Sequence, residues 1–231
     1  MGRMDQGGEA DSKRMTVKAR FGEAWALRCA HLRRWRGVWL AVFGLLAVVV
    51  GVLIPNDRAL LAAIQVDQES VTAWARRLSD WGQFEISTLA IAAFFFLGSW
   101  IVRRPPWRRV ATYALIAGIV GGILVNVFRP TFGRTRPSSD LPDAFHGPSL
   151  DHNFHSFPSG HACSTASTAA AVGFAYPPAA IPMGAFSVAV AWSRLEQRKH
   201  HVSDVLAGLT LGTFVGWFVV GPRRESEPRD D

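Results

Sequence analysis

Long stretches of apolar residues without any charge recur along the chain, and polar segments separate them. They cover residues 37–56, 86–102, 110–128, 162–192 and 205–222. Each stretch is near or above the roughly 17 to 25 residues with which a helix crosses about 30 Å of hydrocarbon. The pattern therefore predicts a series of membrane-spanning helices.

The stretch 162–192 is too long for one crossing, and Pro177-Pro178 lies in its middle. Because proline interrupts a helix, we expect two helices joined by a turn. Each half must include residues of the polar motif at its outer end to reach a full crossing. One long kinked helix is the alternative, and it would leave five crossings. The predicted fold class is all-α, an integral membrane bundle of six transmembrane helices with the active site at the outer face.

Charged residues agree with this topology. Hydrophobic residues make up 49% of the chain and charged residues 19%, and the formal net charge is +7. Lysine and arginine cluster before the first apolar stretch, in the loop 103–109 and at Arg223-Arg224. By the positive-inside rule these segments are cytoplasmic. We expect a multi-pass protein of the cytoplasmic membrane with both termini inside and with segments 57–85, 129–160 and 193–203 outside.

The same charged residues also indicate how the chain is divided into segments and which partners are not expected. We divide the chain into a basic cytoplasmic tail (1–34), a six-helix domain (35–222) and a cytoplasmic tail (223–231), with both tails disordered. No cleavage site follows the first apolar stretch, so it should remain as an anchor. No nucleic-acid-binding motif accompanies the basic residues, so no nucleic acid partner is expected. Cys29 and Cys163 fall on opposite sides and form no disulfide, and the sequence specifies no oligomeric state.

Three polar motifs lie in the segments predicted to face outward. The first runs from Arg129, through six residues, to Arg136-Pro137. The second is Pro158-Ser159-Gly160-His161, directly before the fourth predicted helix. The third begins with Ser193-Arg194, and His200 and Asp204 follow it before the sixth helix. The predicted topology brings all three motifs to one membrane depth on one side.

This ordered set resembles the type 2 phosphatidic acid phosphatase (PAP2) family of the acid phosphatase and vanadium haloperoxidase superfamily. The family pattern is a lysine, six residues and Arg-Pro; then Pro-Ser-Gly-His; then Ser-Arg, five residues, His, three residues and Asp. The resemblance covers roughly residues 50 to 220, and three ordered motifs make it specific. Arg129 is the one departure, because the family usually has lysine there. Arginine keeps the charge and can donate two hydrogen bonds to a phosphate, but it is bulkier, so substrate preference or rate can differ.

The residue types suit phosphoryl transfer without a metal or other cofactor. A phosphoryl group in transfer carries negative charge on its equatorial oxygens, so the site must supply positive charge and hydrogen-bond donors. Three arginines fit this role, and the start of a helix at Ser159 and Gly160 adds backbone N–H groups. The expected phosphate-binding residues are Arg129, Arg136, Ser159, Gly160 and Arg194.

The resemblance implies the catalytic roles. His200 would attack phosphorus and form a phosphohistidine, and Asp204 would hold its other ring nitrogen. His161 would protonate the leaving oxygen and activate the water that releases the phosphate. His201, beside the nucleophile, is interpreted as a neighbour or an interfacial contact.

The expected function is hydrolysis of a phosphomonoester or diphosphate of a membrane lipid, such as phosphatidic acid or a polyprenyl diphosphate. A lipid phosphotransferase with the same histidine is an alternative that the motifs do not separate. A transporter or structural membrane protein is disfavoured, because the predicted spans carry no ionisable residue near the midplane. A vanadium-dependent peroxidase shares the pocket by resemblance, but such enzymes are typically soluble.

Two further patterns in the outer segments receive plain structural interpretations. Histidines and aspartates gather in one loop, but their spacing matches no zinc pattern, so we expect an ordinary polar loop and no metal. They are His146, His152 and His155 with Asp140, Asp143 and Asp151. Apolar residues at helical spacing suggest a helix lying in the membrane interface, with a packing or anchoring role. They are Val71, Trp74, Leu78 and Trp81.

Overall fold

The structure is a computed structural model that describes residues 6–222 except 67 and 140, without the side chains of residues 6–18, 20 and 21. The described part is all-α, with isolated β-bridges as its only strand pairing. Its helices are α1 (Gln6–Leu53), η1 (Ile54–Asn56), α2 (Asp57–Ile64), α3 (Glu69–Trp81), α4 (Phe84–Ile101), α5 (Pro106–Phe132), η2 (His152–Phe154), α6 (Gly160–Ala175), η3 (Pro177–Ala179), α7 (Ala180–Glu196) and α8 (Val202–Val220).

The described residues form two compact units, residues 6–38 with 221–222 and residues 39–220. Helix α1 begins at Gln6, so the expectation of a disordered segment up to residue 34 was wrong for this part. The segment contains no proline before Pro55, and its alanines, arginines and leucines favour a helix. The tail 223–231 lies outside the described residues.

Four helical stretches of the described residues are long and apolar enough to cross a membrane. They are Gly22–Ile64, Phe84–Ile101, Pro106–Phe132 and Val202–Val220. The predicted break in the stretch 162–192 is confirmed, because η3 at Pro177 separates α6 from α7. These two helices have 16 and 17 residues, and both extend into the polar motifs, as expected. Because they lie at the lower limit of a crossing, the count of six crossings stays a prediction.

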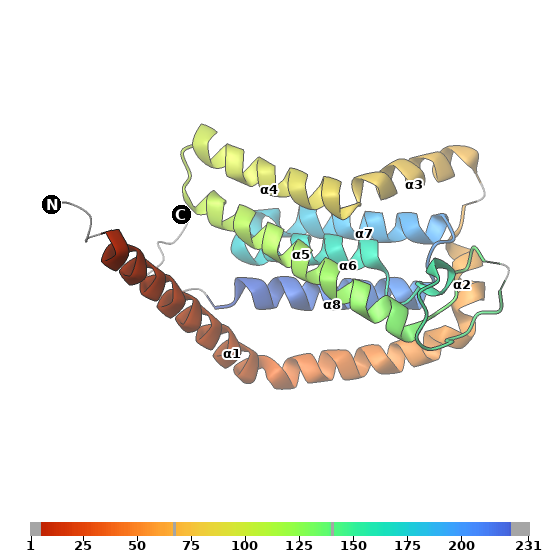
Figure 1. The fold of residues 1–231 in the computed structure, drawn as a ribbon. Coiled ribbons are helices and arrows are strands. Elements are labelled where there is room, and N and C mark those ends of the chain that lie inside the picture. Colours follow the sequence, from red (N-terminus) through yellow and green to blue (C-terminus); the bar gives the residue numbers. More distant parts are fainter. Residues whose placement is uncertain (1–5, 67, 140, 223–231) are drawn as a thin grey trace. The chain divides into compact units, whose positions relative to one another are not determined.

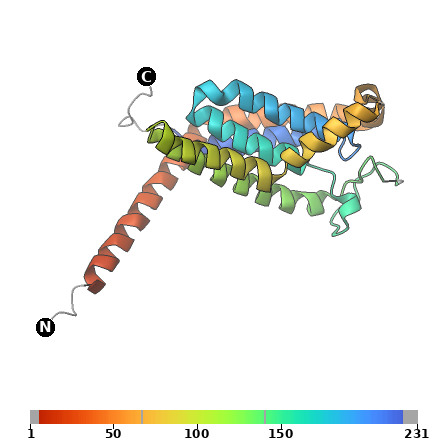
Figure 2. The same ribbon diagram turned by 90° about the horizontal axis from the view of Figure 1, so that it is seen from above.

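Helices α4 to α8 run side by side in both views (Figure 1, Figure 2). Helix α6 lies among α4, α5, α7 and α8. It consists largely of small residues, so its neighbours approach its backbone closely. On α8, a Cβ added to Gly208, Gly212 or Gly216 would overlap a backbone carbonyl of α6 or of the residue before it. The Gly-x-x-x-Gly-x-x-x-Gly pattern of α8 thus determines how closely α8 packs on α6, a contact that was not among the predictions from the sequence.

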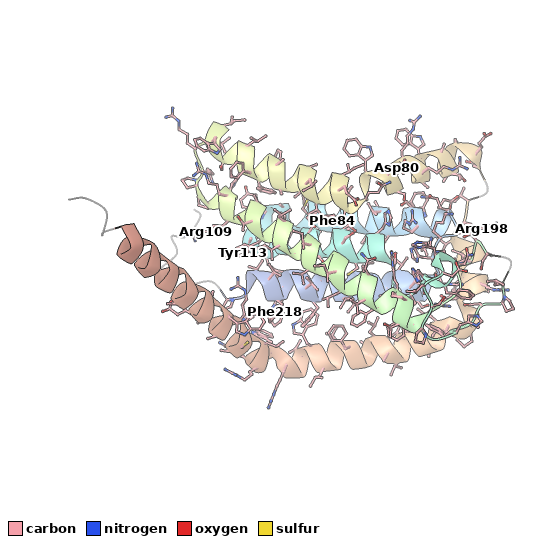
Figure 3. All side chains as sticks on the ribbon, in the orientation of Figure 1. Asp80, Phe84, Arg109, Tyr113, Arg198 and Phe218 are labelled. Atoms are coloured by element: carbon pink, nitrogen blue, oxygen red, sulfur yellow. The ribbon has the colours of Figure 1, made fainter. Side chains whose placement is uncertain are left out.

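The loops with the three motifs lie at one end of this bundle, together with α2 and the α7–α8 turn (Figure 1). Arg109, from the basic loop, lies at the opposite end from Arg198 in the α7–α8 turn (Figure 3). The convergence of the motifs that the topology predicted is therefore present in the fold.

Candidate active site

The first motif is placed by the end of α5. Gly133 ends this helix in the left-handed conformation (φ 58°), and its N–H donates to the Arg129 carbonyl at 3.0 Å. A Cβ at Gly133 would also overlap the Gly147 carbonyl, so only glycine fits there. As a result, Arg129 stays in the last helical turn, whereas Arg134 and Arg136 enter the loop.

The loop then folds back on itself. The Arg136 N–H donates to the Asn153 carbonyl at 3.0 Å, and the Ser156 N–H donates to the Arg134 carbonyl at 3.0 Å. These bonds bring Ser156, which is 22 residues further along the chain, beside Arg134. The motif that begins at Pro158 is thereby positioned against the first motif.

The second and third motifs meet where α6 and α8 begin. The Ser159 N–H donates to the Asp204 carbonyl at 3.0 Å, which ties the two helix N-termini together. Ser159 is the N-cap of α6, but its hydroxyl makes no capping hydrogen bond. The free N–H groups at the start of α6 therefore lie beside the start of α8, and the dipole of α6 favours an anion at this place.

Three arginines that form no ion pair within the described residues surround this place. Arg129 Nε lies 3.4 Å from the Pro158 carbonyl, Arg136 Nε donates to the His152 carbonyl at 3.0 Å, and Arg194 donates to the Ser79 hydroxyl. No carboxylate among the described residues lies within ion-pair distance of these guanidinium groups. We call the group formed by Arg129, Arg136, Ser159, His161, Arg194 and His200 the cationic face.

The cationic face also holds buried polar atoms without a hydrogen-bond partner in the described residues. They are Ser159 Oγ, Arg194 Nε and His200 Nε2. Buried polar groups are normally satisfied, so such a set is unusual for a purely structural site. The Ser159 hydroxyl and Arg194 Nε can donate hydrogen bonds to the oxygens of an anion such as phosphate, and a lone pair on His200 Nε2 could attack its central atom.

The geometry around His200 fixes its tautomer. Nδ1 lies 2.8 Å from the Ser156 carbonyl oxygen, which can only accept, so Nδ1 carries the proton and Nε2 the lone pair. Burial lowers the pKa of His200 to about 4; Asp204 opposes this shift, and Arg194 and Arg129 add to it. The ring is therefore neutral at physiological pH, as a nucleophile must be.

This arrangement corrects the expected partner of His200. The resemblance implied that Asp204 holds Nδ1, but its Oδ2 lies 3.8 Å away, which is too long for a hydrogen bond. The Ser156 carbonyl takes this place instead. Asp204 is close enough to stabilise positive charge on the ring, so its effect on His200 is electrostatic.

His161 lies on the first turn of α6, among the same charges. Its electrostatic neighbours are Arg129, Arg136, Arg194 and His200, so the structure brings the predicted acid and nucleophile together. Gly160 has a steric role, because a Cβ there would overlap the Arg129 guanidinium. Glycine thus lets Arg129 lie directly against the start of α6.

A second group of charges lies behind the cationic face, with Arg134 at its centre. Arg134 is fully buried, and it binds Asp204 at 2.7 Å, Asp57 at 2.9 Å and Asp143 at 3.1 Å. Burial alone would lower the pKa of Arg134, but the three carboxylates raise it above its ordinary value. Ser156 and Ser203 complete the hydrogen bonds. We call these residues, together with His201, the carboxylate network.

His201 belongs to this network, so of its two interpretations, a neighbour of the nucleophile or an interfacial contact, only the first agrees with the structure. Its ring is buried, with Nδ1 3.2 Å from Asp204 Oδ2 and Nε2 3.3 Å from Asp143 Oδ2. Within the described residues, no group of three or more His, Cys, Asp or Glu side chains is arranged to hold a metal ion. Asp143, one of the loop aspartates, binds Arg134 and contacts His201 instead.

Several residues that support the site are not specified by any motif that the sequence reveals. Arg134 lies inside the first motif at a position that the family pattern leaves open, and Asp57 lies far from every motif. Helix α3 was expected only to pack or anchor, but its Ser79 binds Arg194. A polar residue at the start or on one face of a short helix was the only sequence signal for Asp57 and Ser79, and it is a weak one.

The chain is an integral, multi-pass membrane protein whose three motifs meet at one end of the helical bundle. Residues 109–224 match the family PAP2, described as the PAP2 superfamily. The chain is also 31% identical over 173 residues to the decaprenylphosphoryl-5-phosphoribose phosphatase of Mycobacterium tuberculosis, covering 71% of this chain and 89% of that protein. The chain belongs to the PAP2 superfamily.

Two further similarities place it among the membrane members. The lipid A 1-phosphatase of Rhizobium etli is 31% identical over 117 residues, which cover 47% of each protein. The chain thus spans about half the length of this relative. The crystal structure of a transmembrane PAP2 type phosphatidylglycerolphosphate phosphatase from Bacillus subtilis superimposes with a TM-score of 0.61 at 20% identity, covering 78% of this chain and 93% of that one. This similarity shows a common fold.

Proposed function

We propose that this protein is a membrane lipid phosphatase that hydrolyses a phosphomonoester or diphosphate of a lipid through a phosphohistidine on His200. The observation that carries the proposal is the state of the His200 ring. Its Nδ1 is bonded to a carbonyl, and its buried Nε2 has a lone pair and no partner in the described residues. Three arginines that form no ion pair with any described residue lie around this atom, so a phosphate bound there would meet a nucleophile.

The reaction would proceed in two displacements. His200 Nε2 attacks phosphorus, the bond from phosphorus to the lipid oxygen breaks, and His161 gives that oxygen a proton. Water then gives its proton to His161 and attacks the phosphohistidine, the N–P bond breaks, and inorganic phosphate leaves. Arg129, Arg136 and Arg194 stabilise the charge on the equatorial oxygens in both steps, and Asp204 stabilises the positive charge on the ring.

The proposed location follows from the charges at the two ends of the bundle. The basic loop 103–109 lies at the end opposite the site, and by the positive-inside rule that end is cytoplasmic. The site would then face outward in a protein with six crossings, and it would meet lipid headgroups of the outer leaflet. The substrates named for the relatives, a lipid A and a prenyl-linked phosphoribose, support a lipid-linked phosphate.

The test is phosphate release by the detergent-purified protein from phosphatidic acid and from a polyprenyl diphosphate, with EDTA present. His200→Ala serves as the inactive comparison and His146→Ala, an exposed histidine of the same loop region, as the control. Release that requires His200, tolerates EDTA and persists in His146→Ala is the expected result. Release by His200→Ala at the wild-type rate would exclude the nucleophile, and transfer of the phosphate to an added alcohol instead of water would indicate a phosphotransferase.

A further inference from the structure

Asp57 is a buried carboxylate in a place where the family motifs give it no role. It is the first residue of α2, and it lies outside residues 109–224, which match the family. Its side chain is fully buried, and burying a carboxylate is unfavourable unless it is paired and hydrogen-bonded. Its partners therefore indicate what it does.

The hydrogen-bond partners of the Asp57 side chain are Ser203, in the first turn of α8, and Arg134. Asp57 Oδ1 accepts the Ser203 N–H at 3.1 Å, and Oδ2 accepts the Ser203 hydroxyl and, at 2.9 Å, Arg134 Nη2. Arg134 in turn donates to Asp204 at 2.7 Å. Asp57 thus reaches both Ser203 and, through Arg134, Asp204.

These bonds provide acceptors for backbone N–H groups at the start of α8. This helix begins at Val202, two residues after His200. The first N–H groups of a helix have no partner within the helix. Asp204, at the third helical position, accepts the His201 N–H at 2.8 Å, as the acidic residue of a capping box does. The Ser203 N–H, at the second position, is satisfied by Asp57 from another helix. Asp57 therefore caps α8 in trans.

We infer that Asp57 is a positioning residue for the reaction. It holds the start of α8, and with it the turn of His200, at one orientation relative to the arginines of the cationic face. The inference rests on the proposed function, because only a reaction at His200 makes this orientation matter. A misplacement of about 1 Å can lower a rate about 100-fold. Asp57 touches neither the cationic face nor a bound phosphate, so its loss should affect the chemical step more than binding.

The isosteric change Asp57→Asn separates this role from simple packing. Asparagine can still accept the Ser203 N–H through its amide oxygen, but its NH2 group then faces Arg134, which can only donate. The Asp57–Arg134 bond is lost without a change in volume. Asp151→Asn is the matched control, because the exposed Asp151 carboxylate also accepts a backbone N–H, from Asn153 at 2.9 Å, within its own loop.

The first measurement is steady-state hydrolysis of phosphatidic acid by the detergent-purified full chain, with folding followed by thermal unfolding. For Asp57→Asn we expect kcat to fall about 30-fold to 100-fold with KM within about twofold of wild type, measured on folded protein. Asp151→Asn should match wild type. If Asp57→Asn does not fold, Ser203→Ala removes one of the two links to Asp57, and its kcat should fall about 3-fold to 10-fold at constant KM. A folded variant with wild-type kcat, or with only KM raised, would overturn the inference.

The second measurement does not depend on activity. Amide hydrogen exchange in peptides that cover residues 198–206 should become at least about tenfold faster in Asp57→Asn, because the Ser203 N–H then bonds to a neutral amide oxygen, a weaker acceptor that Arg134 no longer holds in place. Peptides of α4 should be unchanged. If exchange is faster in Asp57→Asn but the wild-type protein hydrolyses no lipid, the trans cap is supported and the proposed function is rejected. Unchanged exchange would reject the trans cap whatever the wild-type activity.

Discussion

The cationic face and the carboxylate network lie side by side at one end of the bundle, and their charges are balanced in opposite ways. In the network, one arginine has three carboxylates and two hydroxyl-bearing neighbours, and its guanidinium binds all three acids. In the cationic face, the hydrogen bonds of the three arginines to described residues all go to neutral oxygens. The network is complete as an internal ion cluster, whereas the face is complementary to an anion from outside.

This difference separates the arginines that we expect to bind an anion from those that we expect to stabilise the fold. Arg134 and Arg136 are two residues apart, but Arg134 is fully buried among acids, whereas Arg136 is half-buried and has no described carboxylate within ion-pair distance. Removing an arginine from the network should therefore destabilise the fold. Removing one from the face should lower activity at little cost in stability.

The largest effect is expected for Arg134→Met. The change leaves Asp57, Asp143 and Asp204 buried without their counter-charge, and breaking a buried ion pair costs about 3 to 5 kcal/mol. We expect a large fall in the unfolding temperature and in the yield of folded protein, measured by thermal unfolding in detergent. An unfolding temperature equal to that of wild type would break the distinction between the two groups.

The next effect is expected for Arg194→Met, in the cationic face. Loss of one charge that stabilises the transition state should lower kcat/KM roughly 10²-fold to 10³-fold. The unfolding temperature should stay the same or rise, because Arg194 Nε is buried without a partner. Steady-state kinetics and thermal unfolding of the same preparation test both parts. A fall in stability as large as that of Arg134→Met would contradict the comparison.

A smaller effect is expected for Gly160→Ala. The added Cβ would overlap the Arg129 guanidinium and displace it from the start of α6, so we expect kcat/KM to fall about 10-fold to 100-fold. Gly122→Ala, in α5, is the control, because a Cβ at Gly122 has no heavy atom within 4 Å. Equal activity of the two variants would show that the position of Arg129 is unimportant.

The smallest effect concerns pH. The pKa of His200 is lowered to about 4, so Nε2 keeps its lone pair above this pH and loses it as the pH falls through about 4. We expect the His200-dependent limb of kcat/KM to be flat from pH 6 to pH 8 and to decline only near pH 4. An acid limb near pH 6.5, the ordinary value for histidine, would contradict the burial of this ring.

The same shift affects stability with a defined sign. The folded-state pKa of His200 lies below the unfolded value, so between about pH 4 and pH 6.5 the unfolded chain binds more protons. His200 therefore lowers the stability of the fold as the pH falls through this window. The His200→Ala variant should lose less stability than wild type between pH 7 and pH 4.5, as measured by thermal unfolding.

The apolar parts of the long helices and the residues of the cationic face could be predicted from the sequence alone. Charge-free stretches of sufficient length predict membrane helices, because a helix in lipid must satisfy its backbone internally and present apolar side chains. Pro177-Pro178 predicted the break between α6 and α7 for an equally local reason. The three motifs named every residue of the cationic face, since their order and spacing are properties of the chain.

The hydrogen-bond and ion-pair partners of these residues could be read only from the tertiary structure. Arg134 meets Asp57 across 77 residues, and His200 meets the carbonyl of Ser156 across 44. Such pairs depend on how the loop after Gly133 folds back and on where α2 packs, and no local pattern records either. Buried charges must find partners wherever the fold brings them, so the identity of those partners follows from packing and not from spacing.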